Sequence, residues 1–256
     1  DITVFLATSG TATNINDYTL NSSILIPTGA PSASITLVAV NDTLDETNET
    51  VIIEITTVTN ATEFGTQQQT VTVIDDEVEP TVTLFVDKTN INEESGTATV
   101  TLTLNFASAR DVTVTLAKSG TATEGADYSL VSTILIPAGS PQATATLTGL
   151  SDLLDELDQT VIIDIDTVTN GTESGQQQKT VTIDDNDVEP TVTLSTASAT
   201  VGESGVTSTT TVTATLSAVS EKVVTVALAK SGTALESTDY TLTGTMTIAA
   251  GLSSTS

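Results

Sequence analysis

Apolar and polar residues alternate along most of the chain, and Val, Ile and Leu occupy the apolar positions. The segments TATVTLTLNF (97–106), DVTVTLAK (111–118) and TVIIDIDTVT (160–169) carry β-branched residues at alternate or clustered positions. This pattern is typical of β-strands. No stretch sustains the 3.6-residue apolar period of an amphipathic helix, so the pattern predicts an all-β protein.

Turn-forming residues separate these segments at short intervals. They include Pro27-Thr28-Gly29, Pro137-Ala138-Gly139, Glu94-Ser95-Gly96 and Asn170-Gly171,. About seven short strands per 110 residues favour an immunoglobulin-like Greek-key β-sandwich. We expect the alternating Thr side chains to face solvent. Aromatic residues make up only 3% of the chain, so the core should be aliphatic.

The sequence repeats itself with a period close to the size of one domain. SGTATNINDYTL begins at Ser9, SGTATEGADYSL at Ser119 and SGTALESTDYTL at Ser231, which places the copies 110 and 112 residues apart. Such a period is too long for a solenoid unit and fits an independent domain. We therefore predict tandem sandwiches, one complete and two partial: residues 1–79 without the first strands, 80–189 complete, and 190–256 as the N-terminal part of a third.

The phase of the repeat also bears on assembly. We expect the chain to be an excerpt of a longer protein, in which neighbouring repeats supply the missing strands. If the excerpt is instead the real polypeptide, the third piece of one molecule could complete the first piece of the next. That head-to-tail strand complementation would build a filament.

Charge and composition exclude several classes of function. The chain has 256 residues and a formal net charge of -27, yet 38% of its residues are hydrophobic, so it can bury a core. An acidic surface repels nucleic acid and anionic membranes and attracts cations. The absence of Cys and His from the sequence excludes disulfides, the usual zinc sites and His-based acid–base catalysis,. No apolar run is long enough to span a membrane.

Acidic residues recur at equivalent positions, mostly where strands should end. In the complete copy they are Glu93, Asp127, Asp152, Glu156, Asp185 and Asp187. Carboxylates that converge without Lys or Arg repel one another, and a hard cation relieves the repulsion. Calcium, with 6–8 oxygen ligands, suits irregular loops better than magnesium does. The plainer alternative is a set of solvated acidic loops that keep the protein soluble. Tyr18, Tyr128 and Tyr240 each follow an Asp, and we interpret them as packing anchors.

The order of these motifs resembles the Calx-β domain family. The motifs are a Glu before Gly, SGTAT…DY, an IPAG turn, Asp-x-x-x-Glu before a strand and a closing acidic triplet. The family includes calcium sensors of sodium–calcium exchangers, a module of an integrin subunit and long bacterial surface proteins. The resemblance implies calcium ligands at the six acidic residues of the complete copy. In the other copies it implies Asp17, Asp42, Glu46, Glu49, Asp75, Asp76, Glu77, Glu203 and Asp239. Asn41 and Ser151 replace an acid, Gln159 replaces a Glu and Asn186 interrupts the triplet, so the complete copy should bind fewer ions or bind them more weakly.

These features predict a function for the tandem array. The acidic triplet runs directly into the next repeat through Val-Glu-Pro, and Pro80 and Pro190 restrict the chain there,. We predict a calcium-rigidified extender of a long extracellular or cell-surface protein, an adhesin or fibre. The alternatives are a calcium-sensing regulatory module and an adhesin surface that binds a ligand. No catalytic constellation is recognisable, and we expect no enzyme.

Overall fold

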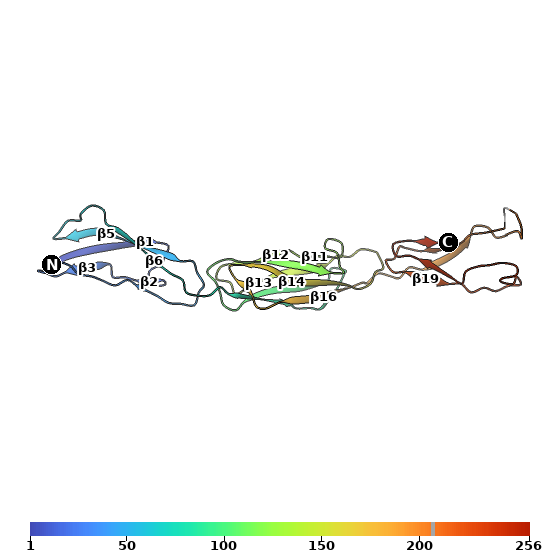
Figure 1. Ribbon diagram of the computed structural model, residues 1–256, viewed down its shortest axis with the longest axis horizontal. Coiled ribbons are helices and arrows are strands. Elements are labelled where there is room, and N and C mark those ends of the chain that lie inside the picture. The colour runs from blue at the N-terminus through green and yellow to red at the C-terminus, as the bar shows by residue number, and fades with distance from the viewer. Residues whose placement is uncertain (206–207) are drawn as a thin grey trace.

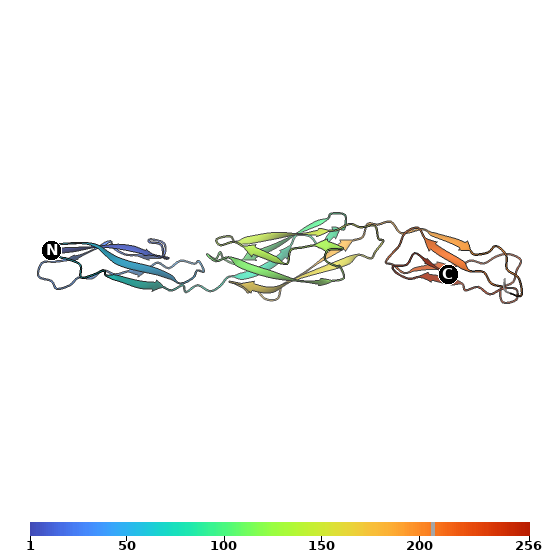
Figure 2. The same ribbon diagram turned by 90° about the horizontal axis from the view of Figure 1, so that it is seen from above.

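The computed structural model describes residues 1–205 and 208–256, and the secondary structure of these residues is entirely β. Three units follow one another along the long axis of the molecule (Figures 1 and 2). We call residues 1–79, 80–189 and 190–256 the first, second and third repeats. Within the described ranges, no helix is long and apolar enough to cross a membrane. The predicted all-β class and tandem sandwich architecture are confirmed.

The second repeat is a two-layer sandwich. One sheet has the order β12-β10-β14-β16-β8 and the other β11-β13-β9-β7-β15. Seven strands have four residues or more, as predicted: β7 (Thr81–Val86), β9 (Thr97–Leu104), β10 (Val112–Gly120), β12 (Thr133–Ile136), β13 (Gln142–Gly149), β14 (Gln159–Thr169) and β16 (Gln178–Asp184). Three shorter strands extend the sheet edges: β8 (Asn90–Asn92), β11 (Tyr128–Ser129) and β15 (Thr172–Glu173).

Strand alternation builds the core of the second repeat. In β9 the side chains of Ala98, Val100, Leu102 and Leu104 are buried, whereas the intervening Thr residues are exposed or half-buried. Val, Ile and Leu from β7, β10, β14 and β16 complete an aliphatic cluster between the two sheets. The outward Thr and aliphatic core are as predicted, because a strand turns successive side chains to opposite faces.

The first repeat consists of β1 (Ile2–Gly10), β2 (Tyr18–Thr19), β3 (Ser23–Ile26), β4 (Val38–Ala39), β5 (Glu49–Thr59) and β6 (Gln68–Val73). Its main sheet has the order β3-β1-β5-β6 and matches the β12-β10-β14-β16 sheet of the second repeat. A bulge recurs at the same place, between Phe5 and Leu6 in β1 and between Thr115 and Leu116 in β10.

The inner face of the first repeat is partly open. An apolar groove of about 300 Å³ is lined mainly by Leu6, Leu20, Ile24, Ile35, Leu37, Ile53 and Ile55. In the second repeat, the β9 and β7 strands cover the corresponding face. The apolar inner face of this unit is therefore left partly uncovered.

The third repeat contains β17 (Val192–Thr196), β18 (Val212–Leu216), β19 (Val224–Ala227), β20 (Thr245–Ile248) and β21 (Ser254–Thr255). A small core of Ala214, Leu216, Met246 and Ile248 joins its two sheets. Two of the three Tyr anchors, Tyr18 and Tyr128, are buried as predicted, and Tyr240 is half-buried.

Candidate metal centre

Carboxylates gather around a hollow at the end of the first repeat, beside the junction with the second. The hollow has a volume of about 420 Å³. Three loops and strand ends form it: the turn before β2, the segment between β4 and β5, and the segment after β6. All seven acidic residues predicted for this repeat line it, namely Asp17, Asp42, Glu46, Glu49, Asp75, Asp76 and Glu77.

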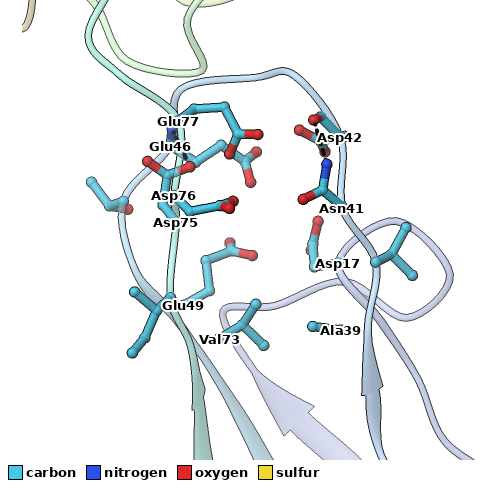
Figure 3. A pocket seen from close by; sticks show the side chains of 13 residues that line it. Asp17, Ala39, Asn41, Asp42, Glu46, Glu49, Val73, Asp75, Asp76 and Glu77 are labelled. Carbon is cyan, nitrogen blue, oxygen red and sulfur yellow. Dashed lines mark hydrogen bonds between the residues drawn. The ribbon is translucent and has the colours of Figure 1, made fainter.

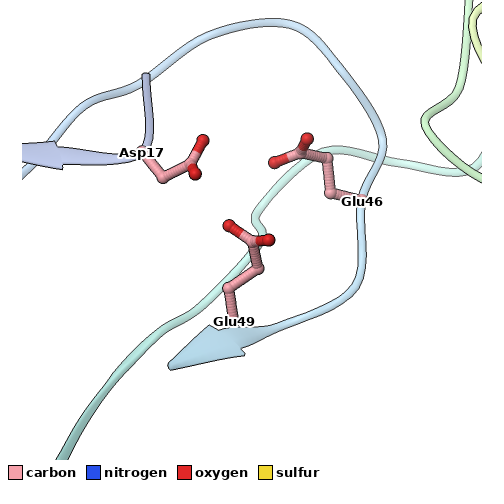
Figure 4. Close-up of side chains that lie close together, drawn as sticks. All are labelled: Asp17, Glu46 and Glu49. Carbon is pink, nitrogen blue, oxygen red and sulfur yellow. The ribbon is translucent and has the colours of Figure 1, made fainter. Parts of the chain in front are cut away.

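Carboxylates border the hollow on two sides. Figure 3 shows Glu46, Glu49 and Asp75 on one side of the hollow and Asp17 and Asp42 opposite them. Carboxylate oxygens of Asp17, Glu46 and Glu49 all lie within 4.8 Å of one another (Figure 4). Among the described residues that line the hollow, none is Lys or Arg.

Local hydrogen bonds hold these acids in place. The backbone N–H of Thr13 donates to Asp17 Oδ2, and that of Leu44 donates to Asp42 Oδ1 at 2.7 Å. The N–H of Glu46 donates to Asp75 Oδ1 at 3.2 Å, which ties the second loop to the third. Each bond fixes the orientation of one carboxylate at the rim of the hollow.

The electrostatics of the hollow reflect this crowding. Burial, together with the neighbouring Asp17 and Glu46, raises the pKa of Glu49 to about 7. The pKa of Glu46 is also raised, first by burial and then by surrounding carboxylates that include Asp17 and Asp42. Burial and like charge both disfavour the ionised form, so a cation in this hollow would relieve an existing cost.

A second cluster lies at the equivalent end of the second repeat. Oxygens of Glu93, Asp185 and Asp187 lie within 4.8 Å of one another. The N–H of Glu93 donates to the Asp184 carbonyl at 3.2 Å, because β8 pairs with β16 there. Burial raises the pKa of Glu93 to about 7, with Asp187 and Asp185 adding to the effect. Glu93 Oε1 and Asp187 Oδ2 are buried and accept no hydrogen bond in the part of the chain that the structure describes.

Asp127, Asp152 and Glu156, the other predicted residues of the second repeat, lie outside this cluster of three, and Asp152 contributes to the raised pKa of Glu93. The N–H of Thr123 donates to Asp127 Oδ2 at 2.5 Å, and that of Leu154 donates to Asp152 Oδ1 at 2.7 Å. Both positions repeat the geometry of the first repeat. The pKa of Glu156 is raised by burial and then by the negative charges of Asp127 and Asp152, so the three carboxylates are close enough to repel one another.

The third repeat shows less of a site. The N–H of Leu235 donates to Asp239 Oδ2 at 2.7 Å, the same turn as at Asp17 and Asp127. Glu203 is exposed. Within residues 1–205 and 208–256, the clusters of three acidic side chains do not include either residue.

Both clusters fit calcium. Two oxygens bound to one Ca²⁺ at 2.3–2.6 Å can be at most about 5 Å apart, and the oxygens of each cluster meet that limit. The candidate ligands are carboxylates on loops and at a strand end, which suits the irregular oxygen coordination of calcium,. A cation, a water or a proton shared between the two carboxyl groups would balance the buried oxygens of Glu93 and Asp187 that have no donor among the described residues,.

A comparison with protein-family models finds the Calx-beta domain three times, at residues 2–77, 75–187 and 184–248. The chain belongs to the Calx-beta family. The resemblance noted in the sequence is thereby confirmed. A comparison with curated proteins finds no significant match.

Solved structures of Calx-beta domains are also similar. The crystal structure of the apo-form Calx CBD1 domain shares 19% identity, covers 42% of this chain and 99% of its own, with a TM-score of 0.35. The calcium binding domain CBD12 of CALX1.1 shares 16% identity over 65% of this chain and 68% of its own, with a TM-score of 0.30. CBD12 from CALX1.2 shares 15% identity over 71% and 87%, with a TM-score of 0.35. Because these scores are low, family membership rests on the family model.

Three further residues near the clusters were not predicted as ligands from the sequence. Gln159 occupies the position of Glu49, and its Oε1 is buried without a donor among the described residues. Amide oxygens also bind calcium, so this Gln keeps an oxygen at the site while removing a charge. Glu221 of the third repeat contributes to the raised pKa of Glu156, so the next repeat adds an acid. Asp155 lies between the acids of its loop, but it contacts the third repeat.

Proposed function

We propose that this chain is a calcium-binding structural segment, in which ions held at the end of each sandwich stiffen the junction with the next. The observation that carries the proposal is the hollow of seven carboxylates at the end of the first repeat. A binding module of this kind needs no catalytic group. The family's calcium binding and the fit of both clusters to that ion support it.

The position of the hollow explains how an ion would stiffen the array. Glu77 is three residues from Pro80, which is buried and begins the second repeat. The Pro80 carbonyl accepts a hydrogen bond from the N–H of Thr172 at 2.9 Å, so the linker joins the second sandwich at once. A cation that binds Asp75, Asp76 and Glu77 would therefore immobilise the residues that lead into the next unit.

Thermal unfolding in EDTA and in millimolar calcium tests the proposal. A ligand that binds only the folded state stabilises it by about 2.7 kcal/mol at 100 times its Kd. For a chain of this size we expect the calcium form to melt several degrees higher, at about 2–4 °C per kcal/mol. Magnesium at the same concentration should give a smaller shift. Identical melting curves in EDTA and calcium would exclude the calcium-binding role.

A sensor function is the second candidate, and one contact favours it. Lys222 of the third repeat lies 2.7 Å from Asp155 Oδ1 and 3.4 Å from Asp185 Oδ2. An ion bound to Asp185 would compete with the ammonium group and change the contact between the repeats. A calcium-dependent change of interdomain angle, measured by small-angle X-ray scattering, would support the sensor, and a constant angle would support the extender.

An extracellular or cell-surface location, as part of a long adhesin or fibre, follows from the extender proposal. Neighbouring repeats of the same protein would be the main partners. Head-to-tail complementation is a second proposal for the apolar groove of the first repeat, because strands β17 and β18 of another molecule's third repeat would bury its Ile and Leu side chains,. Light scattering of the purified chain tests it, since a stable monomer excludes complementation between chains.

A further inference from the structure

The two junctions between repeats contain the same contact. At the first junction Asp45, in the segment between β4 and β5, enters the turn between β9 and β10 of the second repeat. Asp45 is 1% exposed and Ser108 is 1% exposed. The two residues form an isolated parallel β-bridge, in which the N–H of Ala109 donates to the Asp45 carbonyl at 2.9 Å.

The carboxylate of Asp45 is fully partnered by the second repeat. Ser108 Oγ donates to Asp45 Oδ2 at 2.5 Å, and Arg110 Nε donates to the same oxygen at 3.2 Å. Arg110 Nη2 donates to Asp45 Oδ1, which completes a two-pronged ion pair. The N–H of Arg110 in turn donates to Ser108 Oγ at 3.0 Å. The Ser carbonyl accepts from the N–H of Gly139 at 2.7 Å, so the turn is held by its own repeat.

The second junction repeats this arrangement with a different base. Asp155 is 4% exposed and Ser220 is fully buried. Ser220 Oγ donates to Asp155 Oδ2 at 2.6 Å, Lys222 Nζ donates to Asp155 Oδ1 at 2.7 Å, and the N–H of Glu221 donates to the Asp155 carbonyl at 3.0 Å. The Ser220 carbonyl accepts from the N–H of Gly251 at 2.9 Å. Two junctions with different intervening residues thus share one Asp, one Ser and one basic residue.

Burial makes this contact selective. A carboxylate that leaves water needs both hydrogen-bond donors and an opposite charge, and a repeat that lacks either would leave it unpaired. Ser provides the close donor, and the base two residues later provides the charge. A following repeat without the Ser and the base would leave the Asp carboxylate buried and unpaired. Docking of such a repeat is disfavoured, because an unpaired buried charge costs more free energy than an exposed one.

We propose that the loop surface around Asp45 and Asp155 is a docking surface for another Calx-beta repeat. The repeat that docks carries Ser-x-Arg or Ser-x-Lys in the turn between β9 and β10 or in the equivalent turn, which is β18–β19 in the third repeat. Asp45 and Asp155 are docking residues and not metal ligands. The contact fixes the orientation of adjacent repeats before any ion binds. It also sets which repeats can follow one another in the array.

Distances between spin labels on the full chain in EDTA test the proposal. The sequence contains no Cys, so Thr70→Cys and Thr144→Cys, both at exposed positions, place one label in each of the first two repeats. We expect a narrow distance distribution without calcium. Asp45→Asn and Arg110→Met should each broaden it about twofold or more, because domains joined by a small interface otherwise move independently. Arg110→Lys should keep it narrow, since the second junction already uses Lys.

Asp166→Asn is the matched control, because it removes the same charge from an exposed position on β14. It should leave the distribution unchanged. Far-UV circular dichroism identifies any variant that has lost its fold, and Arg110→Met tests the contact from the opposite repeat if Asp45→Asn does not fold. An unchanged width in both Asp45→Asn and Arg110→Met would overturn the proposal, as would a wild-type distribution that is already broad. Since the measurement uses EDTA, it is independent of whether calcium binds, and failure of the calcium proposal would appear separately in the melting curves.

Discussion

At the scale of single residues, spacing in the sequence identifies the acids of the site but not all their roles. Asp42, Glu46 and Glu49 could be grouped because they stand at the end of one loop and at the start of a strand. Asp45 lies in the same loop beside Glu46, and nothing in its local sequence separates it from a ligand. Its partner is Ser108, 63 residues away. Only the packing of two repeats distinguishes a docking carboxylate from a ligating one.

The raised pKa values of Glu49 and Glu93, each about 7, predict how stability changes with pH. An unfolded Glu has a pKa of about 4.3, so the folded protein holds protons that the unfolded chain has released. This contribution to stability is present below the unfolded pKa and is lost as pH rises through about 7. In EDTA we therefore expect the melting temperature to fall between about pH 5 and pH 8.

In calcium we expect the melting temperature to rise over the same pH range. The ion binds the deprotonated carboxylates and competes with protons for them, so its binding strengthens as pH rises. The double variant Glu49→Gln, Glu93→Gln serves as the control and should show a flatter profile in EDTA. A wild-type melting temperature that rises from pH 5 to pH 8 in EDTA would contradict the assignment of these two groups.

Neutralising Asp187 should change stability and affinity in opposite directions. Its Oδ2 is buried without a donor in the described structure, and its charge helps to raise the pKa of Glu93. Asp187→Asn should stabilise the calcium-free protein by about 1 kcal/mol through relief of repulsion. It should also lower calcium affinity about tenfold or more through loss of a ligand. Chemical denaturation and calorimetric titration measure the two effects, and Asp166→Asn should produce neither.

At the scale of strands and loops, the alternation of Thr with Val, Ile and Leu was sufficient to predict the seven longer strands of the second repeat. It could not predict β8, β11 or β15, because two or three residues carry no period. β8 matters for the site, since its pairing with β16 brings Glu93 to Asp185. The sequence identified Glu93 as a candidate ligand, and only the sheet register explains why it reaches the closing triplet.

Gly149 links the end of β13 to this register. A Cβ atom there would lie 2.7 Å from the Asn92 carbonyl oxygen and 3.0 Å from Glu93 Cα. Gly149→Ala should therefore displace Glu93, destabilise the second repeat by roughly 1–3 kcal/mol and weaken calcium binding. Gly244→Ala is the matched control, because its Cβ would have open space around it. Equal melting temperatures and equal calcium affinities for the two variants would show that Gly149 has no such role.

At the scale of the whole molecule, the three repeats lie end to end (Figure 1). The hollow of the first repeat includes Asp75, Asp76 and Glu77, just before the second repeat, and the second cluster includes Asp185 and Asp187, just before the third. The repeat period predicted the succession of units, and the missing spacer predicted that they meet closely. Neither observation predicts the contact between the repeats. That contact forms where the loop that carries Asp45 or Asp155 packs against the turn of the following repeat that carries Ser108 or Ser220. Calcium and the Asp–Ser–base contact then act on the same junction by different chemistry.

Calorimetric titration of the full chain with calcium tests the central claim most directly. The account predicts saturable binding of at least two ions per chain, one for each acidic cluster. The double variant Asp17→Asn, Glu49→Gln should lose the calcium bound by the first repeat and keep the calcium bound by the second. An absence of saturable binding to the wild-type chain at millimolar calcium, or an unchanged number of bound ions in the double variant, would contradict the account.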